Sequence, residues 1–132
     1  MRKTKFSDIP LGVILAVILL CVLAFSAIGT VKTEAATHTR TFKATAYCGC
    51  RKCNDKWYGY PTASGTNYVA GRTVAVYKPQ IKLGTHIWID GKEYIAEDTG
   101  KHIGYDCVDI YFDSHSEANK FGIQKVTVTW ED

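Results

Sequence analysis

Two neighbouring segments in the second half of the chain hold acidic residues at a spacing that suits acid–base chemistry. Residues 108–112 read as a strand whose core face holds Val108, Ile110 and Phe112. The opposite face holds the other alternate positions, which are Cys107, Asp109, Tyr111 and Asp113. Asp98 ends the preceding strand pattern at residues 94–98, just before the turn signal Thr99-Gly100. Two carboxyl groups over one cleft allow one to be kept protonated while its neighbour stays ionised. The alternative is that Asp98 and Asp113 are turn and cap residues and that Asp109 is merely exposed.

Short strands elsewhere in the chain must position these acids. Alternation and β-branched residues predict strands at residues 39–47, 73–76, 86–89, 92–98, 108–112 and 125–130. Asp90-Gly91 predicts a tight hairpin turn. Ser114 and Glu117 predict the capping box of a short helix that stops near Gly122. Six or seven short strands and one short helix predict a mainly β fold, a small β-barrel.

The first 36 residues read as a secretory leader. Arg2-Lys3-Thr4-Lys5 is a positive N-terminal region, residues 9–31 are nearly all apolar, and Ala35 and Ala36 offer cleavage sites. The apolar run is also long enough for an uncleaved membrane anchor. Either case predicts that residues 37–132 form one domain outside the cytoplasm, with the membrane involved only through an uncleaved leader.

The charge balance argues against a nucleic-acid partner. The formal net charge of the chain is +3. Four basic and two acidic residues belong to the leader, so 12 basic and 11 acidic side chains remain of the 16 and 13 in the whole chain. Nucleic-acid binding requires a concentrated basic face, which this composition does not provide.

Four cysteines follow the leader, at Cys48, Cys50, Cys53 and Cys107. In an extracytoplasmic domain of this size we expect two disulfides, with three possible connectivities, and no bound metal. One alternative is a zinc site made by all four thiolates through the C-x-C-x2-C segment, and another is free thiols. Because Cys107 shares a strand face with Asp109, a link from it would hold the N-terminal loop beside the acids.

Ordered motifs over the whole domain resemble the three-aspartate (3D) domain. The matching segments are A-T-A-Y-C at 44–48, T-A-S-G at 62–65, R-T-V-A-V at 72–76, L-G-T at 83–85, A-E-D-T-G at 96–100 and V-D-I-Y-F-D-S at 108–114, followed by E-A and F-G within 117–122. Three features depart from the usual pattern. Gly104-Tyr105 stands where the family usually has a Lys-Gly pair in the loop. Lys101 stands where a second glycine commonly follows D-T-G, and Tyr77 stands where the family typically has aspartate.

The resemblance implies a double-psi β-barrel that cleaves the glycan strands of peptidoglycan. It is the catalytic barrel of membrane-bound lytic transglycosylase A and of small secreted wall-active proteins. By this resemblance Asp109 matches the catalytic acid/base and Asp98 its acidic neighbour. The residues expected to line the sugar cleft are Tyr47, Ser64, Thr99, Gly100, Tyr111 and Asp113.

The implied reaction breaks the MurNAc–GlcNAc β-1,4 bond and forms 1,6-anhydro-MurNAc, with no cofactor and with a monomer as the expected state. We expect Asp98 and Asp113 to raise the pKa of Asp109 by like-charge proximity. A non-catalytic peptidoglycan-binding module on the same barrel is the alternative, favoured by the departures at Tyr77 and Lys101. An aspartic protease is a further alternative, suggested by Asp98-Thr99-Gly100 alone.

Overall fold

The computed structural model describes residues 10–16 and 34–132. The chain divides into two compact units, Met1–Glu34 and Ala35–Asp132. In the first unit residues 11–16 form a short helix. Most of the expected leader, residues 1–9 and 17–33, lies outside the described residues. Within the described part, no helix has both the length and the apolar character needed to cross a membrane.

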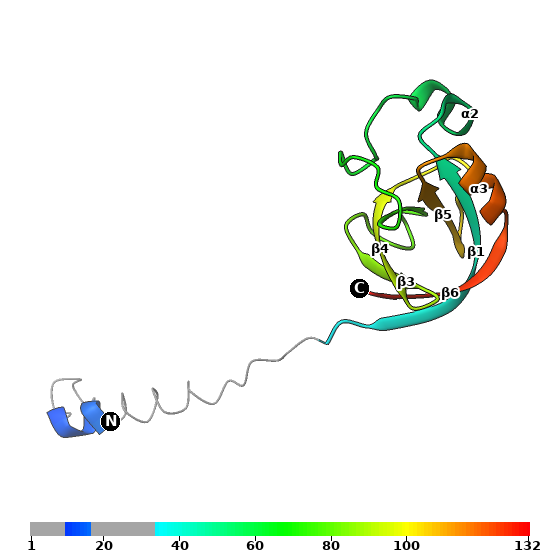
Figure 1. Ribbon diagram of the computed structural model, residues 1–132. Helices are drawn as coiled ribbons and strands as arrows, with labels where there is room; N and C mark the ends of the chain where they lie inside the picture. Colours follow the sequence, from blue (N-terminus) through cyan, green and yellow to red (C-terminus); the bar gives the residue numbers. More distant parts are fainter. Residues whose placement is uncertain (1–9, 17–33) are drawn as a thin grey trace. The chain divides into compact units, whose positions relative to one another are not determined.

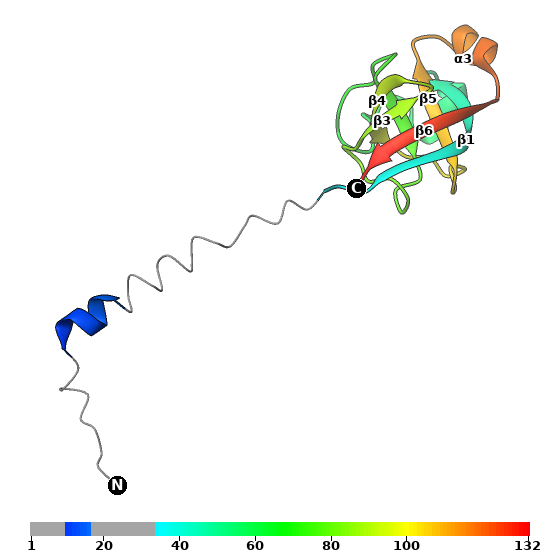
Figure 2. The same cartoon turned by 90° about the horizontal axis from the view of Figure 1, so that it is seen from below.

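The second unit is a closed barrel of six strands (Figures 1 and 2). The strands are β1 (Thr37–Cys48), β2 (Thr73–Val76), β3 (His86–Ile89), β4 (Lys92–Asp98), β5 (Cys107–Phe112) and β6 (Gln124–Glu131). The helices are α2 (Arg51–Asn54), the 3-10 helix η2 (Asp55–Trp57) and α3 (His115–Phe121). The small β-barrel with a short C-terminal helix is therefore confirmed. The two short helices after β1 were not predicted, because the polar segment that follows Cys48 shows no apolar periodicity.

Strand neighbours in the barrel do not follow chain order. The order around the barrel is β1-β5-β2-β4-β3-β6. Two pairs, β1–β5 and β2–β4, are parallel, and the other four are antiparallel. Closure leaves no free sheet edge, which protects a small barrel against pairing with other chains.

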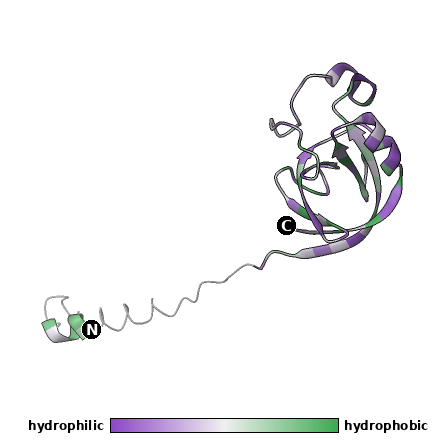
Figure 3. Ribbon diagram, in the orientation of Figure 1, coloured by the Kyte–Doolittle hydropathy of each residue, from purple (hydrophilic) through white to green (hydrophobic). Residues whose placement is uncertain are grey.

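One side of every strand faces a single apolar core. The buried set comprises Phe42, Ala44, Val74, Val76, Ile81, Ile87, Ile89, Tyr94, Ala96, Val108, Ile110, Val126, Val128 and Trp130. Val108, Ile110, Val126, Val128 and Trp130 were expected on core faces and are confirmed there, and Phe112 packs against the core from a partly buried position. Figure 3 shows the contrast between the hydrophobic residues of β5 and the mostly hydrophilic α2 and α3. The core therefore lies inside the barrel, and the outer face of the strands is free to form a site.

Local turn chemistry agrees with the sequence patterns. Asp90 and Gly91 both have positive φ, 47° and 82°, as a type I′ hairpin turn between β3 and β4 requires. The Ser114 side chain accepts a hydrogen bond from the Glu117 backbone N–H, and the Glu117 carboxylate accepts one from the Ser114 N–H. This capping box begins α3, and Gly122, with φ 66°, ends it.

Replacing Ser114 by Ala should lower the free energy of unfolding by about 1 kcal/mol, because the first turn of α3 loses its side-chain acceptor. Thermal or urea unfolding followed by circular dichroism measures the change. Ser116→Ala, in the same turn but outside the cap, serves as the control and should leave the stability nearly unchanged. Equal stability of the two variants would contradict the role of the capping box.

Candidate active site

A second, smaller cluster lies on the outer face of the barrel. Its buried members are Tyr47, Ala75 and Tyr111, against which Cys53, Tyr68, Ala70 and Ile103 pack. These residues alternate in sequence with the core residues of β1, β2 and β5, so they point away from the core. Loop residues after β1 and before β5 thus cover this patch of the outer face.

The two central acids lie on either side of Ala75. In the strand register Asp109 of β5 pairs with Ala75 of β2, and Asp98 of β4 pairs with the same alanine from the other side. Thr45 of β1 pairs with Asp109 in turn. One row across four strands therefore reads Thr45, Asp109, Ala75, Asp98. With strands about 4.8 Å apart, the backbones of the two acids lie about 10 Å apart, and the small alanine leaves room between their side chains.

A register shift in β4 aims Asp98 at this row. Val74 pairs with Ala96, but the next residue, Ala75, pairs with Asp98, so Glu97 is the extra residue of a bulge. Ala96 belongs to the core. In a regular strand Asp98 would share its face, and the bulge turns the carboxylate outward instead. Bulges commonly re-aim a side chain beside active sites.

Both acids line a cleft of about 820 Å³. It is lined by the end of β1 and the loop that follows, by residues of β2, β4 and β5, and by the loop after Asp98. The lining residues include Tyr47, Trp57, Tyr60, Tyr68, Asp98, Thr99, Gly100, Lys101, His102 and Asp109. The size suits several sugar rings or a short peptide, and both acids are among the lining residues.

Hydrogen bonds engage both oxygens of Asp98. Its Oδ2 accepts from the Tyr47 hydroxyl at 2.8 Å, and its Oδ1 accepts from the Ala63 backbone N–H at 2.9 Å. The side chain is buried, with the residue 8% exposed. Two donors, one to each oxygen, hold this carboxylate in one orientation. Asp98 is thus fixed in position and also anchors the loop at residue 63.

Asp109 has a different environment. Its Oδ1 accepts from the Thr45 hydroxyl at 2.8 Å, and within the described residues no hydrogen bond engages its Oδ2. Burial raises the pKa of Asp109 above its ordinary value, the Thr45 hydrogen bond lowers it, and the charge of Asp98 raises it. Burial is the largest of these effects. Asp109 therefore combines a free carboxyl oxygen with a tendency to hold a proton, which are the two properties of a general acid.

The expected cause of that shift is thus only partly correct. Asp98 contributes as expected, but burial contributes more, and Asp113 is not among the causes. Asp113 lies beyond the end of β5, on a separate pocket with Cys48, Cys50 and His115. The pKa of Tyr111 is raised first by burial and then by the negative charge of Asp113.

Tyrosines near the acids remain neutral donors. Burial, and then the negative charge of Asp98, raise the pKa of Tyr47 far above its ordinary value. The same two causes raise the pKa of Tyr68 to about 12. Tyr47 meets Tyr68 and Tyr111 edge-on, and Tyr68 stacks on Tyr111 with ring centroids 5.0 Å apart. This aromatic group packs around Ala75, which lies between the two acids in the strand register.

The structure brings some of the predicted sugar-cleft residues to the cleft and leaves others outside it. Tyr47, Thr99 and Gly100 line it. Ser64 does not, although its backbone N–H donates to the Glu97 carbonyl at 2.9 Å and so ties the T-A-S-G turn to β4. Tyr111 packs in the outer-face cluster and does not line the cleft. Its hydroxyl lies so close to Gly49 that a Cβ at that position would be 3.3 Å away.

Several residues of the site, in the cleft or beside it, were missed by sequence reasoning. Thr45, which positions Asp109, lies within the A-T-A-Y motif, but its partner depends on the parallel β1–β5 register. Trp57 and Tyr60 are each 61% exposed and meet edge-on, with ring centroids 5.9 Å apart. Exposed aromatic rings on a cleft wall mark a ligand-binding surface. The sequence signal for Trp57 and Tyr60 was the presence of two aromatic side chains in an otherwise polar loop.

The departures from the usual 3D pattern at Lys101 and Tyr77 differ in their position. Lys101 lines the cleft, so it can affect ligand binding directly. Tyr77 does not line it and instead contacts Tyr105 with ring centroids 4.9 Å apart. Of these two, only the change at Lys101 thus bears on the site.

The expected disulfides are absent among the four cysteines after the leader, all of which are free thiols. Cys107 pairs with Lys43 near the middle of β1, whereas Cys48 pairs with Phe112 at the other end of β5. Five residues of strand separate these pairs by about 16 Å, too far for a disulfide. Cys107 therefore cannot join the other three, either in a disulfide or in a four-thiolate metal site.

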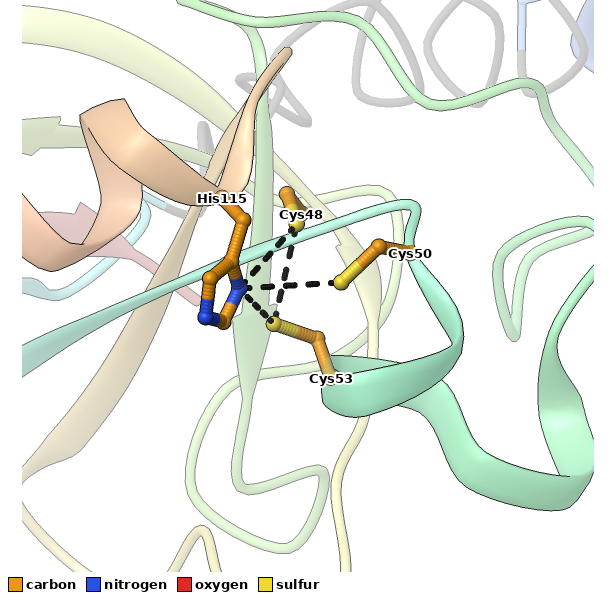
Figure 4. A group of neighbouring side chains, drawn as sticks. All are labelled: Cys48, Cys50, Cys53 and His115. Atoms are coloured by element: carbon orange, nitrogen blue, oxygen red, sulfur yellow. Dashed lines mark hydrogen bonds between the residues drawn. The ribbon is translucent and has the colours of Figure 1, made fainter.

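Cys48, Cys50 and Cys53 converge instead on His115, the first residue of α3 (Figure 4). His115 Nδ1 lies 3.8 Å from the Cys48 Sγ, 3.6 Å from the Cys50 Sγ and 3.5 Å from the Cys53 Sγ. The Cys48 and Cys53 sulfurs are 3.6 Å apart. Sequence reasoning missed His115 because it follows the cysteines by more than 60 residues and was assigned only to a helix start.

Part of the chain matches a known protein family and a curated relative. Residues 72–130 match the 3D domain family, which confirms the resemblance read from the motifs. The SPbeta prophage-derived uncharacterized protein YorM of Bacillus subtilis (strain 168) is 32% identical over 90 residues. That match covers 65% of this chain but only 38% of the relative, so the chain corresponds to about two fifths of its length.

Solved structures of MltA from E. coli are also similar. One has a TM-score of 0.49 and 21% sequence identity and covers 55% of this chain and 27% of that chain. A variant of the E. coli lytic transglycosylase MltA, in its apo-2 form, gives a TM-score of 0.49, 20% identity and the same coverage.

Proposed function

We propose, from the match of residues 72–130 to the 3D domain and from the arrangement of its acids, that this protein cleaves the glycan strands of peptidoglycan as a lytic transglycosylase. The observation that carries the proposal is the unequal environment of the two acids. Asp98 has both oxygens engaged, whereas Asp109 has one free oxygen and a raised pKa. A reaction with a single acid/base needs one such residue rather than the pair used by ordinary glycosidases.

In the proposed reaction protonated Asp109 donates its proton to the glycosidic oxygen as the MurNAc–GlcNAc β-1,4 bond breaks. The resulting carboxylate then accepts the proton of the muramoyl 6-hydroxyl while that oxygen bonds to the anomeric carbon. The 1,6-anhydro ring closes, and Asp109 ends protonated as it began. The fixed charge of Asp98 helps Asp109 to hold its proton at the start and can stabilise positive charge that develops on the sugar.

The cleft offers a matching surface for a polysaccharide. Trp57 and Tyr60 present exposed rings on one wall, and Lys101 and His102 present polar groups on another. Aromatic rings bind the apolar faces of sugars, while polar groups fix their orientation. Asp98 and Asp109 do not match the carboxyl pair of an aspartic protease, which shares a proton at about 3 Å, because a whole strand separates them.

The proposed place of action is outside the cytoplasm, in the cell wall or on the outer face of the membrane. The support for this is the leader pattern in residues 1–36 together with an extracellular polymer as substrate.

Incubation of the protein with purified sacculi, followed by mass spectrometry of the soluble fraction, tests the function. We expect muropeptides that end in 1,6-anhydro-MurNAc, with no new reducing ends. Binding to sacculi without release of muropeptides would instead favour the non-catalytic wall-binding module. Release of reducing-end products would indicate a hydrolase.

A further inference from the structure

The cluster of Cys48, Cys50, Cys53 and His115 contains neither acid and plays no part in the proposed reaction. The four donor atoms, three sulfurs and one imidazole nitrogen, all lie within 4.8 Å of one another. Figure 4 shows the four side chains pointing toward a common centre from two segments, the end of β1 with α2, and the start of α3. Three of them are partly exposed and Cys48 is buried.

A bound zinc ion requires particular distances between its four ligand atoms. A tetrahedral Zn²⁺ holds sulfur at about 2.3 Å and nitrogen at about 2.0–2.1 Å, which places two sulfurs about 3.8 Å apart and sulfur and nitrogen about 3.6 Å apart. The Cys48–Cys53 sulfur distance is 3.6 Å, and the three sulfur–nitrogen distances are 3.5–3.8 Å. A disulfide would instead require about 2.0 Å between sulfurs. Four of the six donor–donor distances therefore match a tetrahedral zinc site, and the other two sulfur–sulfur distances are below 4.8 Å.

We propose that these four residues bind one Zn²⁺ in a closed, structural Cys3His site. Thiolate and imidazole ligands select zinc over magnesium or calcium, which prefer oxygen. With four protein ligands no position is left for a substrate, so the ion acts on structure rather than on chemistry. A pocket of about 520 Å³ lined by Cys48, Cys50 and His115 gives the ion a path from solvent.

Backbone contacts hold the ligands in place. The N–H groups of Cys53 and Asn54 donate to the Cys50 carbonyl at 3.2 and 3.1 Å, which turns the chain so that Cys53 returns beside Cys50. The Asn54 side-chain amide donates to the Cys48 and Cys50 carbonyls at 2.6 and 3.1 Å. The capping box at Ser114 fixes the start of α3, and with it His115. The site is thus supported on both of the segments that it joins.

The site also bears on the cleft. Cys53 lines the cleft and packs against the outer-face cluster. Trp57 and Tyr60 follow it in the same loop. An ion that ties this loop to α3 would therefore fix one wall of the cleft relative to the barrel. The zinc site itself does not depend on the proposed function, because metal binding is measured separately from glycan cleavage.

The test is the metal content and the intact mass of the full-length protein purified with a trace of zinc. We expect one zinc per chain by elemental mass spectrometry and the fully reduced mass under denaturing conditions. Melting should occur about 10 °C or more higher with zinc at a hundredfold excess over its Kd than with a chelator. Substitution with Co²⁺ should give the visible and near-ultraviolet bands of tetrahedral thiolate coordination.

Variants identify the ligands. Cys50→Ser and His115→Ala should each weaken zinc binding by more than about tenfold, since even changes behind the ligands cost 10–100-fold. Cys107→Ser and His102→Ala, which change the same residue types away from the cluster, should keep full zinc content. A mass lower by two hydrogens without zinc, indicating a Cys48–Cys53 disulfide, would overturn the proposal. Free thiols that bind no zinc, or an equal loss of zinc in Cys107→Ser, would overturn it as well.

Discussion

Asp109→Asn should lower the release of muropeptides from sacculi by about 10²–10⁴-fold, or to background. Asparagine keeps the size of the side chain and can still accept the hydrogen bond from Thr45, but it has no proton to transfer. The substitution acts on the outer face of β5, so the core remains intact. Mass spectrometry of released muropeptides measures the rate, and circular dichroism confirms that the variant is folded.

Asp113→Asn provides the matched control. It changes the same residue type near the end of the same strand, but on a separate pocket. We expect it to keep most of the activity. A folded Asp109→Asn that retains most activity would place the acid elsewhere, and an equally large loss in Asp113→Asn would mean that charge near β5, rather than proton transfer, governs the rate.

Features that depend on short stretches of sequence were predicted well. Each strand rests on local alternation, the hairpin at Asp90-Gly91 on two positive φ angles, and the start of α3 on the Ser114 cap. In these cases the residues that determine the structure lie within a few positions of one another. The opposite faces of β5 follow from the same local rule, so the outward direction of Asp109 was predictable.

Features that depend on distant pairing were not predicted. The parallel register of β1 with β5 brings Thr45 to Asp109, and the bulge at Glu97 turns Asp98 outward. Neither leaves a periodic signal in the chain. The same register places the end of β1 beside the end of β5, which brings His115 to the cysteines and leaves Cys107 behind. If the β1–β5 register had been known, the Cys3His cluster would have been predicted in place of the two disulfides.

Asp98→Asn and Thr45→Val should shift the pH dependence of activity in opposite directions. The charge of Asp98 raises the pKa of Asp109, and the Thr45 hydrogen bond lowers it. Removal of the charge therefore lowers the pKa, so Asp109 loses its proton at lower pH and the alkaline limb of the profile moves toward acid. Removal of the hydroxyl raises the pKa, so the proton is kept to higher pH and the limb moves toward alkali.

Both variants should fold, since valine has the shape of threonine and asparagine can still accept from the Ala63 N–H. Asp98→Asn should lower the maximal activity less than Asp109→Asn, because it removes a supporting charge and not the transferable proton. Rates of muropeptide release between about pH 3 and 8, a range that brackets the ordinary carboxyl and histidine pKa values, give the two profiles. Shifts in the same direction would mean that the limb reports a group other than Asp109.

Because burial is the largest cause of the raised pKa, neither substitution should return Asp109 to the behaviour of an exposed carboxyl group, and both profiles should keep an alkaline limb above that of a free aspartate.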